Sequence, residues 1–240
     1  MGRREARRGR GGVCGAMQIF LAGATGATGT ELLPLARARG LTVRPHVRPQ
    51  TAARHPLGKD PDAVVCDLGD AAALEAGVRG CGAIVSLVGT MRSRFGTGDT
   101  YESADVGSAR QLVAAAVAAG VPRFLLLSSV GAGGAGAYLQ MKGDCERIVR
   151  EAPGLRWTVF QPSALVSAPD AAGHHGRREL LPGMMALGGL VRALPGLRGV
   201  ADDWRAIPIA VLCEAILAVL ERPRDGEVLL GRDLWALAGR

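Results

Sequence analysis

The sequence predicts an α/β fold in which helices cover both faces of one parallel sheet. Its apolar runs are continuous rather than alternating, and longer helix-like stretches separate them. Continuous apolar runs indicate strands that are buried on both faces, and helices between successive strands are typical of parallel crossovers. We therefore expect a doubly wound sheet in a single domain over residues 17–240.

Six apolar runs predict the strands of this sheet. They are 18–23, 41–47, 63–68, 81–89, 123–130 and 155–162. The run "CGAIVSLVG" is strongly apolar, whereas Pro45 weakens the second strand because proline lacks the amide that donates to a ladder.

Helical stretches fill the intervals between the strands. They are 27–39, a short stretch from Asp70, 101–119 and 137–151. The third ends at Gly120, since glycine is common just past the end of a helix. Each helix is expected to cross over between two parallel strands.

The C-terminal part departs from this alternation. Residues 163–206 are punctuated by Pro, Gly and His, which predicts a small capping region over the carboxyl edge of the sheet, on the substrate side. An amphipathic helix over 207–223 and a short strand in "GEVLLG" then complete the fold. That helix is compatible with a homodimer or with packing on the sheet of a monomer, and the sequence leaves both open.

The composition excludes several classes of function. With 48% hydrophobic and 21% charged residues, the chain is typical of a globular protein rather than a disordered one. Only 4% of the residues are aromatic, which argues against stacking platforms for single-stranded nucleic acid. The best candidate for a membrane span, "LLPGMMALGGLVRALPGL", is broken by Pro182, Arg192 and Pro195. We expect neither nucleic acid nor a membrane as a partner of the folded domain.

Much of the formal charge of +7 lies in residues 1–16. Five arginines and one glutamate there account for four of the seven excess charges, so the remaining chain is only mildly basic. We interpret the segment as a disordered or mis-started basic leader before a domain that begins at Met17. A basic arm that binds polyanions is the alternative. The segment lacks the apolar core of a secretory signal.

The five cysteines are odd in number and scattered, with no CxxC pair. This pattern predicts reduced thiols in a cytoplasmic protein and no metal site. Cys145 is expected to pack in the core, because nothing near it in the sequence would depress its pKa. The adjacent His174 and His175 have no third ligand at a suitable spacing, which favours a loop over the substrate cleft.

The stretch "LAGATGATGTELL" carries the strongest motif in the chain. Three glycines spaced by three follow a predicted strand and open a predicted helix, which is the context of a dinucleotide-binding loop. Glycines permit the tight turn, the approach of a pyrophosphate and close helix–strand packing, and the helix amides face the phosphates. A small-residue packing turn is the alternative. The residues expected to line the cofactor here are Gly23, Thr25, Gly26, Ala27, Thr28 and Gly29.

Two charged residues further along bear on the choice of cofactor. Arg48 follows the second strand, where an acid that binds the ribose hydroxyls would indicate NAD. A guanidinium suits a 2′-phosphate instead, so NADP(H) is predicted in preference to NAD(H), with a solvated arginine as the alternative. Asp67, after the third strand, is expected either to accept a bond from the adenine amino group or to cap the following helix.

A serine, a tyrosine and a lysine form the candidate catalytic set. Ser128 and Ser129 end the fifth strand, at the edge where open α/β sheets bind ligands. Tyr138 and Lys142 lie four apart and therefore share one helix face. The Tyr138 phenol is suited to protonate a carbonyl oxygen, the Lys142 ammonium to favour the ionised phenol and bind the nicotinamide ribose, and Ser129 to polarise the carbonyl.

With these motifs in place, the chain resembles an atypical short-chain dehydrogenase/reductase of the NmrA-like superfamily. The segments "LAGATGATG", "GTMRSRFG", "LLLSSVGA", "YLQMKGDCE" and "IPIAVLCEAIL" are similar to the branch of oxidoreductases related to the HIV-1 Tat-interactive protein. The resemblance implies a Rossmann-type fold, NADPH binding and the serine, tyrosine and lysine roles above. It also implies that Gly89, Thr90 and Ser128 lie close to the cofactor, with Arg92 or Arg94 near its phosphates or an anionic substrate.

One departure from this superfamily is Gln161 in "VFQPSAL", where an arginine is usual before the proline. Several relatives in this branch bind cofactor without a settled substrate, so fold and cofactor transfer better than turnover. Two functions are therefore expected. One is an NAD(P)H-dependent oxidoreductase of a small carbonyl or alcohol. The other is a redox sensor or regulatory scaffold that binds NADP(H) without turnover.

Overall fold

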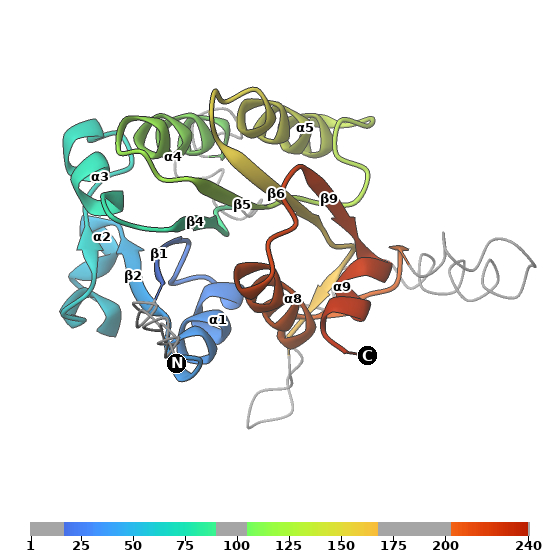
Figure 1. Cartoon of the computed structure of the whole chain (residues 1–240), viewed down its shortest axis with the longest axis horizontal. Coiled ribbons are helices and arrows are strands. Elements are labelled where there is room, and N and C mark those ends of the chain that lie inside the picture. Colours follow the sequence, from blue (N-terminus) through green and yellow to red (C-terminus); the bar gives the residue numbers. More distant parts are fainter. Residues whose placement is uncertain (1–16, 90–104, 168–202, 240) are drawn as a thin grey trace, which may run out of the picture.

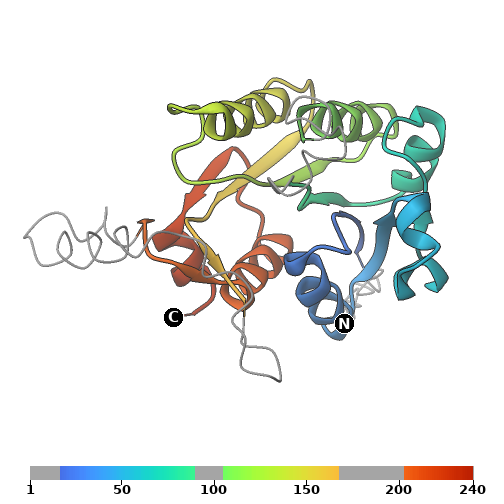
Figure 2. The ribbon, with the colours of Figure 1, turned by 180° about the vertical axis from the view of Figure 1, so that it is seen from behind.

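The computed structural model describes residues 17–89, 105–167 and 203–239. Within them, a sheet of parallel strands lies between two layers of helices (Figure 1). One layer holds α3, α4 and α5, and the opposite layer holds α1, α8 and α9; the view from behind shows the same arrangement (Figure 2). The predicted doubly wound parallel sheet is confirmed.

The strands have the order β3-β2-β1-β4-β5-β6-β9, and each pairs in parallel with its neighbours. Their bounds are β1 Gln18–Ala22, β2 Thr42–Val47, β3 Val64–Val65, β4 Ala83–Ser86, β5 Arg123–Leu127, β6 Arg156–Gln161 and β9 Glu227–Leu230. The order reverses between β1 and β4, which is the switch point where open α/β sheets form their ligand crevice.

The helices that cover the sheet are α1 Ala27–Ala38, α3 Ala71–Val78, α4 Gly107–Ala118, α5 Ala137–Arg150, α8 Ile209–Glu221 and α9 Gly231–Leu237. A short α2 (Pro49–Ala52) and a 3-10 turn (Pro56–Lys59) link β2 to β3. The sequence did not predict these two or α9. The leader 1–16 and the start of the predicted helix at 101–104 lie outside the described residues.

Alternate residues of the central strands enter two separate cores. Ile19 and Leu21 of β1 pack toward α1 and α8, whereas Phe20 and Ala22 pack toward the other helical layer. Successive side chains of a strand point to opposite faces, so a strand buried on both faces must be apolar throughout. This explains the continuous apolar runs.

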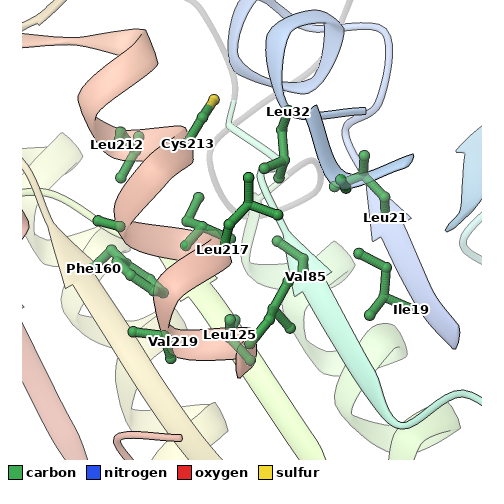
Figure 3. Close-up of a cluster of buried hydrophobic side chains, with 14 of the residues drawn as sticks. Ile19, Leu21, Leu32, Val85, Leu125, Phe160, Leu212, Cys213, Leu217 and Val219 are labelled. Carbon is green, nitrogen blue, oxygen red and sulfur yellow. The ribbon is translucent and has the colours of Figure 1, made fainter. Parts of the chain in front are cut away.

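Helix α8 is more deeply buried than the predicted amphipathic helix. Nine of its 13 residues are buried, and it packs between α1 and α9 against the sheet. Figure 3 shows that Leu212, Leu217 and Val219 of α8 lie in one cluster with Phe160 and Leu125 of the sheet. The helix packs on the sheet, as one of its two expected uses requires, and its use in a homodimer stays a prediction.

Pro45 is accommodated within β2, although β2 lies between two other strands. It pairs in register with Leu21 of β1, but the ladder to β3 begins only at His46. The short β3 therefore leaves the proline outside the pairing on that side, where a missing amide costs nothing.

The two described ends of the predicted 163–206 capping region lie side by side. Leu165–Val166 (β7) pairs in parallel with Ile207–Pro208 (β8) in a separate two-stranded sheet. Residues 168–202 lie outside the described residues, and with them His174 and His175. The capping role of this region stays a prediction.

Candidate functional site

The glycine loop joins β1 to α1 at the switch point, and two of its three glycines, Gly23 and Gly29, have a steric reason. Gly23 has φ +85°, and a methyl group on it would lie 2.9 Å from the carbonyl carbon of Leu87. A methyl group on Gly29 would lie 2.6 Å from the Cα of Ala24 and nearer still to the carbonyl oxygen of Gly23. The Gly26 amide donates to that same oxygen at 3.0 Å, which closes the turn.

The start of α1 is suited to an anion. Gly26 is the N-cap, and it supplies no side-chain bond to the helix amides; the first turn carries no acid. The first amides of a helix have no partner within it, and the helix dipole adds positive potential there. Gly26 and Ala27 are exposed and Thr25 is half-buried, whereas Thr28 and Gly29 are buried. The accessible part of the loop is therefore its Thr25–Ala27 portion.

Arg48 and Asp67 lie at the carboxyl ends of β2 and β3, on the same edge of the sheet as the glycine loop. Both charges act on the His46 ring, so both lie close to it. Asp67 accepts a bond from the Gly69 amide at 2.9 Å, while Asp70 caps α3 by accepting from Ala73 at 3.0 Å. The alternative that Asp67 caps this helix is wrong, and its carboxylate lies exposed beside the candidate site.

His46 supplies a prediction about stability and pH. The ring is 5% exposed, its Nε2 bonds the Cys66 carbonyl oxygen at 2.9 Å, and burial lowers its pKa. Below the pKa of an unfolded histidine, about 6.5, the unfolded chain binds more protons than the folded one. As the pH falls below that value, the free energy of unfolding therefore decreases, by up to about 1.4 kcal/mol per pH unit from this group. Urea unfolding between about pH 5 and 7 measures the slope.

His46→Gln keeps a side-chain amide that can donate to the carbonyl of Cys66, and it should flatten this acid-side slope. His55→Gln is the matched control at a half-buried histidine, and it should retain the wild-type slope. Equal slopes in the wild type and His46→Gln would contradict the assignment.

The structure brings Lys142, Tyr138 and Gly89 together. The Lys142 ammonium is buried, and its Nζ lies 5.9 Å from the centre of the Tyr138 ring. A methyl group on Gly89 would lie 3.6 Å from the same Nζ. Thr90, Arg92 and Arg94 follow Gly89 in the chain and lie outside the described residues.

The two serines after β5 differ in their surroundings. Ser128 is buried, and its Oγ donates to Glu146 Oε1 at 2.5 Å. Ser129 is half-buried, and among the described residues its hydroxyl makes a single long contact, of 3.4 Å with the Val130 carbonyl oxygen. Ser129 is therefore the better placed of the two to donate to a ligand, whereas Ser128 can still accept.

Three residues beside this set were not assigned a role from the sequence. Asp105, just before α4, is buried and lies 3.8 Å from Lys142 Nζ. Glu146 lies one helical turn after Lys142, a spacing that would have placed it on the same face of α5. Gln161, the departure from the superfamily pattern, donates to Glu146 at 2.7 Å. Asp105 follows no motif, and only the fold brings it to Lys142.

The described cysteines and carboxylates form no second reactive site. Cys145 is buried in a hydrophobic core, as predicted, and this burial raises the pKa of its thiol to about 11. Asp203 is buried and ion-paired with Arg232 of α9. Within the described ranges, no group of three His, Cys, Asp or Glu side chains is arranged to hold a metal ion. Nor does any helix in those ranges have the length and apolarity to cross a membrane.

Comparison with known proteins decides the family. A family described as NAD(P)H-binding matches residues 23–183, which is more than half of the chain and begins at the first glycine of the loop. The chain belongs to this family. NAD(P)H is thus the class of cofactor that this family binds.

Three curated relatives of this NAD(P)H-binding chain align at low identity. Protein FMP52-1, mitochondrial, of Scheffersomyces stipitis is 30% identical over 103 residues, 42% of this chain and 46% of the relative. Protein FMP52, mitochondrial, of Debaryomyces hansenii is 28% identical and covers 62% of this chain and 67% of the relative. The uncharacterized sugar epimerase YhfK of Bacillus subtilis is 27% identical and covers 71% and 82%. The chain spans less than half the length of the first of these.

Solved structures share the fold of this NAD(P)H-binding chain. A short-chain dehydrogenase/reductase superfamily protein from Agrobacterium tumefaciens with bound NAD has a TM-score of 0.64 at 20% identity, over 92% of this chain and 81% of its own. ChuY, an anaerobillin reductase from Escherichia coli O157:H7, has a TM-score of 0.61 at 18% identity, over 88% and 95%. A nucleoside-diphosphate-sugar epimerase from Pseudomonas aeruginosa has a TM-score of 0.63 at 20% identity, over 93% and 78%. These likenesses confirm the Rossmann-type fold.

Proposed function

We propose that this protein is an NADPH-dependent oxidoreductase that interconverts a small carbonyl compound and its alcohol. The observation that carries the proposal is the buried ammonium of Lys142 beside Tyr138 and Gly89, at the sheet edge that also carries the glycine loop. A buried charge is costly unless it is paired, and Asp105, 3.8 Å from Lys142 Nζ, provides the pairing that lets the ammonium lie at this edge.

The residues of the loop fit a dinucleotide. Methyl groups on Gly23 and Gly29 would collide with backbone atoms, so only glycine allows the turn to pack this tightly at the start of α1. In the proposal, Gly23, Thr25, Gly26, Ala27, Thr28 and Gly29 hold the pyrophosphate, and Gly89, Thr90 and Ser128 lie along the nicotinamide half. Asp67 accepts from the adenine amino group, and Arg48 binds a 2′-phosphate. Bound there, NADPH would supply the hydride for reduction.

Side chains of α5 and of the segment after β5 then transfer the proton and orient the carbonyl group. Tyr138 donates its phenolic proton to the carbonyl oxygen during reduction and takes a proton from the alcohol in the reverse direction. The positive charge of Lys142, whose Nζ lies 5.9 Å from the centre of the Tyr138 ring, attracts the negative charge that this transfer leaves on the phenol oxygen. Ser129 donates a hydrogen bond to the carbonyl oxygen and fixes its direction.

Arg48→Ala should weaken binding of NADPH about 10- to 100-fold and leave binding of NADH within about threefold. The reason is that a charge-assisted pair with the 2′-phosphate exists only for NADPH. Titration calorimetry with each cofactor measures both constants. Arg54→Ala, at an exposed arginine of the same connection, is the control and should change neither. Equal losses for both cofactors in Arg48→Ala would overturn the NADP preference.

Turnover distinguishes the proposed enzyme from a cofactor sensor. The purified chain is mixed with NADPH and, in turn, with phenanthrenequinone, menadione and benzaldehyde, and loss of the reduced nicotinamide is followed by absorbance. Reduction of at least one probe supports the enzyme. Tight NADPH binding without reduction of any probe would support a regulatory role instead.

The setting of the protein in the cell completes the proposal. The described cysteines, Cys66, Cys81, Cys145 and Cys213, are all free and buried, which suits a reducing compartment such as the cytoplasm. Two yeast relatives carry "mitochondrial" in their names, so cell fractionation is the deciding measurement.

The motifs quoted above support placement beside the Tat-interactive branch, with a small molecule as substrate.

A further inference from the structure

We propose that Glu146 is a positioning residue, which holds α5, and with it Tyr138 and Lys142, against the ends of β5 and β6. The inference rests on the proposed function and adds to its site a residue that touches neither substrate nor cofactor.

The Glu146 carboxylate is buried and fully engaged. It is 4% exposed. Its Oε1 accepts hydrogen bonds from Ser128 Oγ at 2.5 Å and from Gln161 Nε2 at 2.7 Å. Its Oε2 accepts from an Arg150 nitrogen at 2.5 Å. Three donors and one positive charge thus satisfy a group that would be costly to bury alone.

The two partners of Oε1 belong to neighbouring strands. Ser128 directly follows β5, and Gln161 is the last residue of β6, the strand that pairs with β5. A single carboxylate of α5 therefore joins the helix to two strand ends at the edge where the site lies. Because Ser129 follows Ser128, the same bond anchors the segment that presents the proposed substrate-binding hydroxyl.

The spacing along α5 links this anchor to the reacting groups. Tyr138, Lys142 and Glu146 follow one another at intervals of four and share one face of the helix. A rotation or slide of α5 would therefore move Tyr138 and Lys142 relative to Ser129. Misplacement of catalytic groups by about 1 Å can lower the rate on the order of 100-fold. The network is thus placed to affect turnover more than cofactor affinity.

A neighbouring carboxylate provides the control. Glu146 lines a cleft of about 420 Å³ together with Gly143, Arg150, Gln161 and Glu151. Glu151 ends the same helix and is exposed. Glu151→Gln removes the same charge from the same cleft and leaves the bonds of Glu146 in place.

Glu146→Gln tests the proposal with a side chain of equal size. Its amide nitrogen must face one of the three donors, so at least one bond of the network is lost. We expect kcat for the quinone and aldehyde probes to fall about 10- to 100-fold, with KM and the affinity for NADPH changed no more than about threefold. Gln161→Leu removes one bond and leaves Glu146 paired with Arg150, so it should lower kcat in the same direction if Glu146→Gln fails to fold. Glu151→Gln should match the wild type.

The outcomes separate three cases. A drop in kcat without a matching rise in KM supports positioning. A lower melting temperature with kcat within about twofold of wild type, in Glu146→Gln and in Gln161→Leu, overturns it in favour of a purely structural role. If the wild type reduces no probe, the proposed function fails and this inference fails with it, a case that the wild-type assay alone identifies.

Discussion

Tyr138→Phe should lower the rate of carbonyl reduction about 100- to 10,000-fold while the affinity for NADPH stays within about twofold of wild type. The hydroxyl is the proposed proton donor, and general acid catalysis typically contributes this much to a rate. The phenylalanine ring keeps the contact with Lys142, and the glycine loop Gly23–Gly29, where the pyrophosphate is proposed to bind, is untouched. Steady-state kinetics with the quinone and aldehyde probes, together with calorimetric titration of NADPH, measure both quantities.

Gln140→Ala is the matched control for this variant. Gln140 is an exposed residue of the same first turns of α5, and its replacement should leave both turnover and binding unchanged. Wild-type turnover in Tyr138→Phe would contradict the catalytic role assigned to the tyrosine. Equal loss of NADPH binding would show instead that the ring supports the cofactor.

Gly29→Ala should remove detectable NADPH binding and lower the free energy of unfolding by about 1–3 kcal/mol, as overpacking of a tight site does. The added methyl group would lie 2.6 Å from the Cα of Ala24, and closer to the Gly23 carbonyl oxygen, so only backbone movement can relieve the clash. That movement would displace the loop that brings the amides of α1 to the cofactor. Urea unfolding and calorimetry measure the two effects.

Gly26→Ala separates the cofactor from the fold. Its methyl group would meet the Gly23 carbonyl oxygen at 3.3 Å, a contact that a small adjustment relieves, and Gly26 has an ordinary negative φ. It should therefore fold nearly as well as the wild type but bind NADPH more weakly, because the methyl group lies on the exposed part of the loop. If Gly29→Ala binds NADPH as the wild type does, the loop is a packing turn and not a cradle.

Local patterns in the sequence were sufficient to predict the sheet and the proximity of Tyr138 and Lys142. Strand burial follows from continuous apolar runs, and the glycine loop follows from spacing together with its place between strand and helix. Tyr138 and Lys142 lie together because residues four apart share a helix face, whereas the part of Ser129 in the same site stays a prediction. Each of these signals lies within a few residues of chain.

The features that sequence reasoning missed depend on contacts between distant segments. Glu146 pairs with Gln161 across 15 residues, and Asp105 reaches Lys142 from another helix. The near-complete burial of α8 requires both α1 and α9 beside it, and α9 follows a strand whose end was not anticipated as a helix start. Local sequence does not determine such pairings. An acidic residue looks the same in the sequence whichever partner it has, and an apolar helix looks the same whether one or two helices pack beside it.

Calorimetric titration of the full chain with NADPH, and separately with NADH, is the direct test of the proposed cofactor site. We expect saturable binding of NADPH at one site, with weaker binding of NADH. No heat of binding with either cofactor would contradict the proposal, because the roles given to the glycine loop and Lys142, and the proposed reaction, all require that complex.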